Sequence, residues 1–579
     1  MVALAALTCS CAKENIVNEG GPKPAASKVI NTPENADAES ILIYVADGVA
    51  GTAAVDSIAK AAGALACKPL FESYPGHEED ERKFGLDRWY KLDLKKGTSL
   101  ETVATALSSQ KKIERVQYNT CMRNVVTRRP HPYVSNIQTK AVQNSNAAFN
   151  DPMLSKQWSY HNTGNGNPVW NSVAGADVNV TDAWKLTGGD PSIIVAVVDE
   201  GVAYSHPDLA ANMWSDPKTG KHGYNFVTDT DRITWTDAND SGHGTHVAGT
   251  VAAVNNNGIG VSSVAGGTGN HDGVKIMSCQ IWVGNQSSSE AVARAFRYAA
   301  DNGASIAQCS FGDDAGAYMT DDEFKRKCSV EYAAIQYFLD KKKCNSNAVD
   351  GNIIVFSAGN NGLKISSYPG ALKEVISVTS FGPGFQPAGY TNYGTGCNIA
   401  APGGDYYVGR PGYNTKCEVY STIPGANYEG GYGWMEGTSM ATPHVSGVVA
   451  LGLAYARKLG LKFTREEFIS MLLTSVNSID SYFTGTKKKD ETGDMDLSWY
   501  VGKMGTGAVD AWKLLMNIEG TPSYQVAVGQ STIDLTDVLG APAAVLKNFS
   551  VEMDDDTRSS LGVTGCLLYT SDAADDLIG

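Results

Sequence analysis

Runs of consecutive apolar and β-branched residues recur through the middle of the chain, and each stops at a polar or glycine-rich position. The first run, residues 193–198 (IIVAVV), is typical of a parallel strand that is covered on both faces. Helical patterns lie between most of the runs, notably at residues 288–303 and 323–343. Strands that alternate with helices over this length predict an α/β domain with a doubly wound, mostly parallel sheet. The further predicted strands cover residues 274–282, 304–311, 352–360 and 374–380.

Polar side chains stand where several of these strands end. Asp199 follows the first run, residues 310–312 (SFG) stand at the end of the third, and Asn360 ends the fourth. Ligands of open parallel sheets gather at the carboxyl ends of the strands. We therefore expect a functional site at this edge of the sheet.

Two glycine turns each lead into an apolar helical stretch. In residues 437–447 (GTSMATPHVSG), Pro443 lacks an N–H and is tolerated only in the first helical turn, which places Ser439 at the helix start. In HGTHVAG, His243 lies at the mouth of a helix and suits a general base, whereas His246 lies one turn inside, where a core histidine is expected. A metal site is not favoured there, because the H-E-x-x-H pattern is absent. The alternative for Ser439 is a simple helix cap.

Four motifs occur in a fixed order: VVDEGV, HGTHVAG, SAGN and GTSMATPHVSG. From about residue 150 to 519 the chain resembles the subtilisin-like serine proteases (subtilases). Subtilisin itself is the reference case for this Asp, His, Ser order, so the roles that follow are those the resemblance implies. It implies a serine endopeptidase with Ser439 as nucleophile, His243 as base and Asp199 orienting the imidazole. Asn360 would stabilise the oxyanion together with the Ser439 N–H.

The same resemblance implies a peptide-binding cleft and a structural Ca²⁺ ion. Uncharged pocket walls favour a large apolar residue before the cleaved bond, although Asp313 and Asp314 keep a basic preference open. Oxygen-only ligation with two carboxylates suits Ca²⁺, and no cofactor is expected for the chemistry. The implied peptide-binding residues are Val283, Gly284, Asn285, Ser310, Phe311, Gly312, Ser357, Ala358 and Gly359, and the implied Ca²⁺ ligands are Asp151, Asp208, Val254, Asn257, Ile259 and Val261.

Residues 40–120 alternate strand and helix patterns in the order βαββαβ, which predicts a ferredoxin-like α+β unit. A unit of this kind before a protease domain resembles the propeptides of subtilases, which inhibit the enzyme and are then removed. The alternative is a stable accessory domain. Residues 121–149 are an irregular connector in which we expect the processing cut.

The first residues indicate export. Residues 1–11 resemble the end of a bacterial lipoprotein signal, with Cys11 as the lipid-bearing residue, and residues 12–39 resemble a tether. We expect an outer-membrane or cell-surface lipoprotein, or a secreted protein, that meets the membrane only through its lipid. The formal charge of −15 argues against nucleic acid as a partner. A monomer with polypeptide substrates and its own propeptide as partners is expected.

The C-terminal pattern changes after about residue 520. Residues 520–565 show short alternating stretches typical of the start of a β-sandwich-like domain, which we expect to be truncated. Residues 566–579 contain CLLYTSDAADD, which resembles a translated sequencing adapter, so we expect them not to be biological.

Two other functions stay open beside the endopeptidase. One is a protease restricted to its own propeptide, and the other is a noncatalytic surface protein that binds peptides in the same cleft. Glu436 departs from the small or neutral residue expected before Gly437. We interpret it as a side chain that could lie near the cleft and tune His243.

Overall fold

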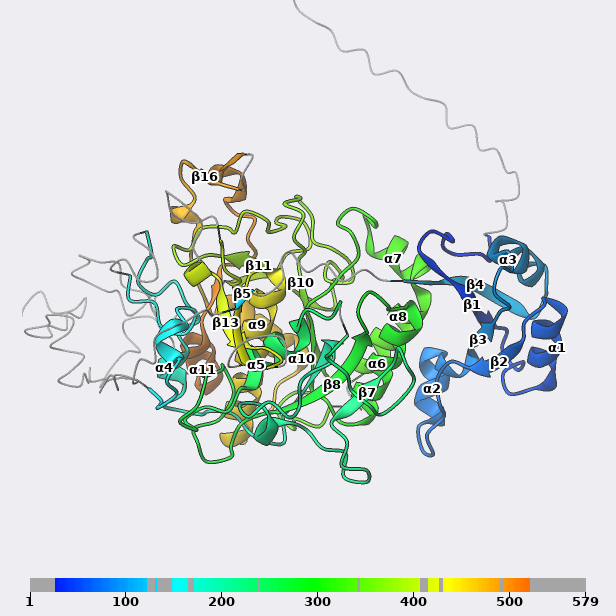
Figure 1. Ribbon diagram of the computed structural model, residues 1–579, viewed down its shortest axis with the longest axis horizontal. Coiled ribbons are helices and arrows are strands. Elements are labelled where there is room, and N and C mark those ends of the chain that lie inside the picture. Colours follow the sequence, from blue (N-terminus) through cyan, green and yellow to red (C-terminus); the bar gives the residue numbers. More distant parts are fainter. Residues whose placement is uncertain are drawn as a thin grey trace, which may run out of the picture.

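The computed structural model describes residues 27–121, 131–132, 148–164, 171–237, 239–340, 344–406, 415–425, 431–489 and 493–520. A small N-terminal unit (residues 27–121) lies against one side of a larger α/β unit (residues 148–520), as Figure 1 shows. The predictions for Cys11 and the rest of residues 1–26, for most of the 121–149 connector, and for residues 521–579 lie outside the described residues. They stay predictions.

The α/β unit is built on a nine-stranded sheet in the order β15-β18-β12-β11-β10-β9-β6-β8-β7. All neighbouring strands run parallel except the β15–β18 pair. The strands are β6 (Ile194–Glu200), β7 (Gly223–Asn225), β8 (Lys275–Trp282), β9 (Ile306–Cys309), β10 (Ile353–Ser357), β11 (Ile376–Phe381), β12 (Ile399–Pro402), β15 (Val476–Asn477) and β18 (Ala508–Val509).

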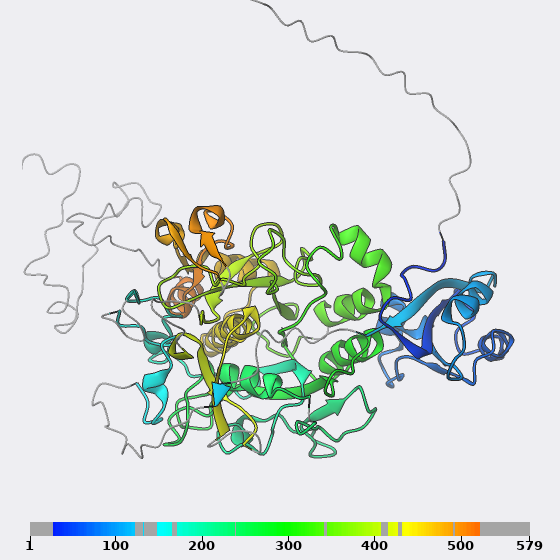
Figure 2. The same cartoon turned by 45° about the horizontal axis from the view of Figure 1, so that its top comes forward.

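Helices cover both faces of this sheet, as the turned view in Figure 2 also shows. Strand β6 is apolar from residue 194 to residue 198 because both of its faces are covered. Val195 and Val197 belong to the core under α5 (His243–Ala252) and α9 (Thr438–Lys458), while Ala196 and Val198 belong to the core under α6 (Ser289–Asp301) and α8 (Ser329–Leu339). Alternate side chains of a strand point to opposite faces, so both sets must be apolar. The predicted α/β class with a doubly wound, mostly parallel sheet is confirmed.

The structure of this unit differs from the sequence analysis in two ways: one predicted helix is divided, and four short strands were not predicted. The helical pattern at 323–343 is two helices, α7 (Asp321–Lys327) and α8, because the backbone leaves the helix at Cys328 with φ −115° and ψ 49°. The strands β7, β12, β15 and β18 have four residues or fewer, too short for an apolar run to stand out. The remaining elements of this unit are α4 (Val180–Ala183), β13 (Val419–Thr422), β14 (Tyr432–Met435), α10 (Arg465–Thr474), β16 (Thr486–Lys488), β17 (Asp494–Asp496) and α11 (Ala511–Glu519).

The N-terminal unit is a four-stranded antiparallel sheet in the order β2-β3-β1-β4, the ferredoxin-like arrangement expected. It also contains a helix, α2, that the sequence analysis did not predict. The elements are β1 (Ala36–Val45), α1 (Ala53–Ala61), β2 (Ala66–Pro69), α2 (Glu78–Phe84), β3 (Trp89–Asp93), α3 (Leu100–Ser108) and β4 (Ile113–Thr120). From the connector, β5 (His131–Pro132) pairs with β14.

Strand β4 meets the first turns of α6 and α8, where helical N–H groups have no intrahelical acceptor. The side-chain oxygen of Gln117 accepts the Val330 N–H at 3.2 Å, and that of Asn119 accepts the Glu290 N–H at 3.1 Å. Lys91 adds an ion pair with Glu290 at 2.6 Å. The sheet of the N-terminal unit therefore caps two helices of the α/β unit.

Helix α2 makes a second contact between the two units. It places Lys83 2.5 Å from Asp340 and Glu81 2.6 Å from Arg297, and Glu81 and Arg297 are both buried. Within the parts of the chain that the structure describes, no helix is long and apolar enough to span a membrane, and the eight cysteines are all free thiols.

Candidate active site

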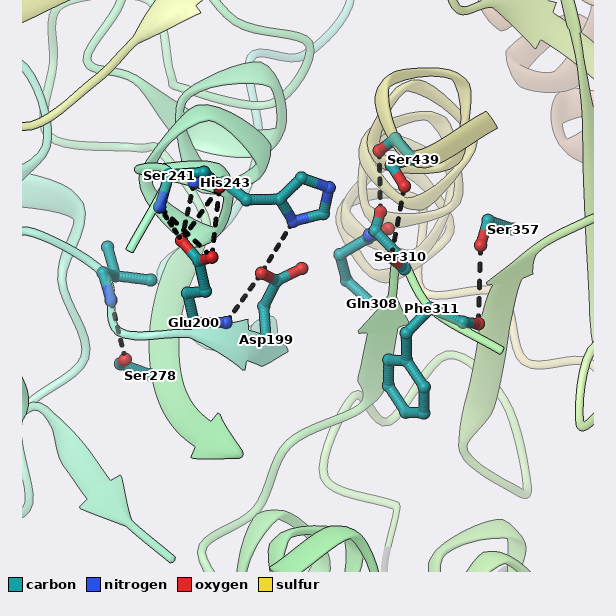
Figure 3. A network of polar contacts seen from close by, with 11 residues as sticks. Asp199, Glu200, Ser241, His243, Ser278, Gln308, Ser310, Phe311, Ser357 and Ser439 are labelled. Carbon is teal, nitrogen blue, oxygen red and sulfur yellow. Dashed lines mark hydrogen bonds and ion pairs between the residues drawn. The ribbon is translucent and has the colours of Figure 1, made fainter. Parts of the chain in front are cut away.

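Three secondary-structure elements bring Asp199, His243 and Ser439 to the carboxyl edge of the sheet (Figure 3). Asp199 is the residue before the last of β6, His243 is the first residue of α5, and Ser439 is the second residue of α9. Gly242 precedes α5 with φ 79°, in the left-handed region that favours glycine. A glycine is therefore needed where the chain turns sharply into the helix that carries His243.

His243 is held by Asp199. The imidazole Nδ1 lies 2.7 Å from Asp199 Oδ1, and the two side chains are 2% and 1% exposed. Burial lowers the pKa of His243, but the charge and hydrogen bond of Asp199 and the charge of Glu200 outweigh it, so the pKa is raised above its usual value. With the Nδ1 proton shared with Asp199, Nε2 is the atom able to accept a proton.

Ser439 and Ser310 hold each other through two hydrogen bonds. Ser439 Oγ donates to the Ser310 carbonyl oxygen at 3.2 Å, and Ser310 Oγ donates to the Ser439 carbonyl oxygen at 2.7 Å. Among the described residues, His243 Nε2 is buried without a hydrogen-bond partner. Figure 3 shows the imidazole lying on the side that faces Ser439. A change of the Ser439 rotamer is the step that would bring Oγ toward Nε2, and such contacts often tighten only when substrate binds.

Asn360 has a fixed amide orientation. Its Oδ1 accepts the backbone N–H of Thr438 at 2.9 Å and the Thr438 hydroxyl at 2.8 Å. Asn360 lines the same cavity as Ser439, and its Nδ2 has no hydrogen-bond partner within the described part of the chain. Two donors on Oδ1 leave Nδ2 as the amide's available donor at this cavity.

The cavity beside Ser439 contains most of the predicted pocket residues. Ala358 is fully buried behind the wall and does not line it. Residues 283–285 are not among the residues that line this cavity. Val283 pairs with Gln286 in a tight turn, and Gly284 donates its N–H to Asp240 at 2.7 Å. The lining residues are Ser310, Phe311, Gly312, Asp313, Ser357, Gly359, Asn360, Asn361, Ser367 and Ser439.

Asp313 adds a carboxyl group to this lining. No ion pair or side-chain hydrogen bond holds it among the described residues. Burial raises the pKa of Asp313 to about 7, and the nearby carboxyl groups of Glu331 and Asp314 act in the same direction. The pocket therefore holds an acidic side chain that has no cationic partner in the described part of the chain.

The predicted Ca²⁺ ligands also lie together. Asp151 accepts the N–H groups of Asn256 and Asn257 at 2.9 and 3.0 Å. Asp208 is fully buried and accepts Asn257 Nδ2 at 2.7 Å and the Val261 N–H at 2.9 Å. Burial raises the pKa of Asp208 to about 7, with the charge of Asp151 adding to the effect.

Two buried carboxyl groups so close together fit a cation site, because within the described residues no Lys, Arg or His pairs with either. Asn257 presents Nδ2 to Asp208 in this arrangement. Its Oδ1 accepts the Ile259 N–H at 2.9 Å. A Ca²⁺ ion would require the amide turned so that its oxygen faces the ion, which would break both of these hydrogen bonds. Residues Val254, Ile259 and Val261 would add backbone carbonyl oxygens.

The sequence analysis missed two residues of the site, Glu200 and Thr438. Glu200 follows Asp199 directly and contacts the backbone of His243, with a distance of 3.0 Å between Glu200 Oε2 and the His243 nitrogen. Glu436, the acid that the sequence analysis considered, instead accepts the Tyr406 N–H at 2.6 Å. The acidic neighbour of His243 beyond Asp199 is therefore Glu200. An acidic residue next to the motif aspartate was the signal that could have identified it.

Comparison with known proteins gives one family. The family model described as "Subtilase family" matches residues 190–497. The chain is 34% identical over 271 residues to the thermophilic serine proteinase of Bacillus sp. (strain AK1), an alignment that covers 46% of this chain and 54% of that protein. It is 29% identical over 375 residues to the extracellular protease of Xanthomonas campestris pv. campestris, covering 58% of this chain and 54% of that protein.

A solved structure shows the same fold. The crystal structure of fervidolysin from Fervidobacterium pennivorans superposes with a TM-score of 0.52 and 20% sequence identity, covering 84% of this chain and 62% of that one. The chain thus spans about half the length of the two curated relatives above.

Proposed function

The chain belongs to the subtilase family of serine peptidases, and we propose that it is an endopeptidase that cleaves extended polypeptides through an acyl-enzyme. The observation that carries the proposal is the buried pair of His243 Nδ1 and Asp199 Oδ1, 2.7 Å apart, at the edge where Ser439 begins α9. A serine hydroxyl needs such a base to become a nucleophile.

The residues suggest the following course. Ser439 Oγ attacks the peptide carbonyl carbon as its proton passes to His243 Nε2, and Asp199 stabilises the imidazolium. The oxyanion accepts hydrogen bonds from Asn360 Nδ2 and from the Ser439 N–H, an amide without an intrahelical acceptor. The C–N bond then breaks as Nε2 returns the proton to the leaving amine. Water, deprotonated by Nε2, releases the acyl group and regenerates the hydroxyl.

Labelling with a fluorophosphonate probe tests the nucleophile. Once the N-terminal unit has been removed, we expect the chain to be labelled and the Ser439→Ala variant to stay unlabelled. Labelling that persists in the variant, or its absence from the folded parent, would overturn the proposal in favour of a noncatalytic peptide binder. The exposed Ser498 gives a matched control, because Ser498→Ala should be labelled as the parent is.

The N-terminal unit is proposed to be an inhibitory propeptide. Its support is the capping of α6 and α8 by Asn119 and Gln117, together with the ion pairs that α2 makes to Arg297 of α6 and to Asp340, which follows α8. Labelling of the uncut chain with the fluorophosphonate probe distinguishes an inhibitory propeptide from a stable accessory domain. A chain that is labelled only after cleavage in the 121–149 connector is a zymogen, and one labelled equally before cleavage carries an accessory domain.

The pocket is proposed to prefer a large apolar residue before the cleaved bond. Phe311 and the uncharged residues Gly312, Ser357 and Gly359 support this choice. Asp313 supports a basic preference as the second candidate, because its carboxyl group belongs to the same lining. A peptide library distinguishes the two by the residue found at that position.

A structural Ca²⁺ ion and export from the cell complete the proposal. The Ca²⁺ site rests on the buried carboxyl groups of Asp151 and Asp208 and on the loop between residues 254 and 261. Export rests on the Xanthomonas relative, which is described as extracellular, and on the lipoprotein-like start with Cys11. A lipid anchor is tested by mass spectrometry of the N-terminal peptide from a bacterial membrane fraction.

A further inference from the structure

Glu200 is a buried acid beside the catalytic residues that the mechanism above does not use. It is the last residue of β6 and is 1% exposed. Its carboxylate accepts the Ser241 N–H and hydroxyl, each at 3.1 Å from one of its oxygens, and the His243 N–H at 3.0 Å. Figure 3 shows these contacts converging on Glu200 from the start of α5. The carboxylate thus satisfies donors that a helix start otherwise leaves without partners.

Neighbouring residues of β6 therefore hold one histidine at two points. Asp199 Oδ1 is hydrogen-bonded to the imidazole Nδ1 of His243, and Glu200 Oε2 accepts the backbone N–H of the same residue. The two acids are themselves linked, since the Glu200 N–H donates to Asp199 Oδ1 at 2.7 Å. Gly244 allows this close approach, because a Cβ there would lie 2.2 Å from the Glu200 carbonyl oxygen. The start of α5 is fixed against the end of β6, with little freedom to shift.

Few charged or titratable groups among the described residues lie around Glu200 and His243. Asp199 on the same strand, His243 on α5 and Asp240 in the turn before α5 act on Glu200, whose pKa burial raises to about 7. His246 on α5 is fully buried, and burial lowers its pKa to about 3, so it is neutral near pH 7 and adds no charge beside His243. Glu200 and Asp199 are therefore the negative charges that act on the imidazolium of His243.

We propose that Glu200 is a positioning residue for the base: it anchors the start of α5 so that His243 stays on Asp199, and its negative charge favours the imidazolium. The inference rests on the proposed serine peptidase function. A helix cap alone would need only an acceptor, such as the hydroxyl or amide of a neutral side chain. A carboxylate at this place, in contact with the histidine backbone, also changes the proton affinity of the ring.

The Glu200→Gln variant removes the charge and keeps an oxygen that can accept from Ser241 and His243. We expect the acid limb of the pH profile of kcat/KM to move to lower pH by less than about one unit. The imidazole loses a favourable charge, but Glu200, with a pKa of about 7, carries that charge only in part where the limb falls. The matched control is Glu436→Gln, which removes a buried carboxyl group that contacts Tyr406 and not His243. Its acid limb should stay at the parent's midpoint. An unmoved limb in Glu200→Gln would overturn the inference, as would equal shifts in both variants.

A second measurement is independent of peptidase activity. In a Ser439→Ala background, an NMR titration of ¹⁵N-labelled histidine reports the His243 pKa directly, and adding Glu200→Gln should lower it. The two proposals can therefore fail separately. If Glu200→Gln lowers the His243 pKa but the fluorophosphonate probe never labels the chain that carries Ser439, the role of Glu200 stands and the proposed function fails. If Glu200→Gln does not fold, Ser241→Ala serves instead. Losing that donor raises the Glu200 pKa and reduces its charge near pH 7, so the His243 pKa should fall by a smaller amount. An unchanged His243 pKa in folded Ser241→Ala contradicts the inference.

Discussion

Ser439 donates its hydroxyl to the carbonyl oxygen of Ser310 and receives the Ser310 hydroxyl on its own carbonyl oxygen. The nucleophile at the start of α9 is thereby fastened to the segment that follows β9. The contact extends through Gln308, whose Nε2 donates to Ser310 Oγ at 2.6 Å and whose Oε1 accepts the Ser446 hydroxyl at 2.6 Å. All four residues are buried, so the network sets where Ser439 stands relative to the pocket.

Ser310→Ala is expected to lower the free energy of unfolding by about 1–3 kcal/mol, because it leaves the buried Ser439 carbonyl oxygen and Gln308 Nε2 without partners. The value of kcat should fall as Ser439 loses its fixed position. Denaturant titration and steady-state kinetics measure both effects. Ser498→Ala, at an exposed position, serves as the control. Unchanged stability in Ser310→Ala would show that water replaces the lost hydroxyl.

Asn360→Ala is expected to reduce kcat with little change in KM, because the amide would act on the oxyanion and not on the bound peptide. Removal of one such donor in subtilisin costs roughly 100- to 1000-fold in kcat, and we expect the same range here. Thr438→Val keeps the backbone N–H to Asn360 Oδ1 and removes the hydroxyl, so its loss should be much smaller. A reduction confined to KM in Asn360→Ala would contradict the assigned role.

The pH dependence of the parent follows from the raised pKa of His243. The base works only when neutral, so kcat/KM should fall as the pH drops through that pKa. The midpoint should lie above about 6.5, the usual value for histidine. A profile of kcat/KM across neutral pH on one peptide measures it. A midpoint below that usual value would mean that burial outweighs the two acids.

Asp199, His243 and Ser439 could be predicted from the sequence because each lies at a local sequence signature. Asp199 ends an apolar run, and Ser439 and His243 each follow a glycine turn before a buried helix. Glu200 and Thr438 lie directly beside these signatures, but their roles arise from contacts with segments 41 or more residues away, which no local pattern shows. Helix α2 was missed for a similar reason. Its sequence EEDERKF has no apolar face, and it is held by ion pairs such as that of Glu81 with Arg297.

Asp313→Asn tests what the pocket recognises. If the carboxyl group pairs with substrate cations, cleavage after Arg or Lys should fall by at least tenfold, whereas cleavage after Leu or Phe should stay near the parent's rate. Asp314→Asn removes a neighbouring but exposed carboxylate and is the matched control. If cleavage follows large apolar residues in the parent and in both variants, the apolar preference stands and Asp313 has no part in selection.

Removal of Ca²⁺ is expected to destabilise the chain. Asp208 is buried and accepts three hydrogen bonds, including one from Tyr432 at 3.3 Å, yet no cationic side chain among the described residues balances it. The loop is also shaped closely around it, because a Cβ at Gly260 would lie 2.3 Å from Asp208 Oδ2. At a free Ca²⁺ concentration of 100 times its Kd, an ion that binds only the folded chain raises the free energy of unfolding by about 2.7 kcal/mol. Thermal unfolding should therefore show a lower Tm in EDTA than in Ca²⁺.

The variant Asp208→Asn should unfold at the same Tm in EDTA and in Ca²⁺, because it removes one of the two charges that would hold the ion. Asp182→Asn alters an exposed acid paired with Lys185 and should keep the parent's response. If the parent's Tm does not change on chelation, the carboxyl groups of Asp151 and Asp208 are satisfied by the loop alone. In that case Asp208 is neutral mainly below about pH 7, since burial raises its pKa to about 7, and protonation there removes the uncompensated charge.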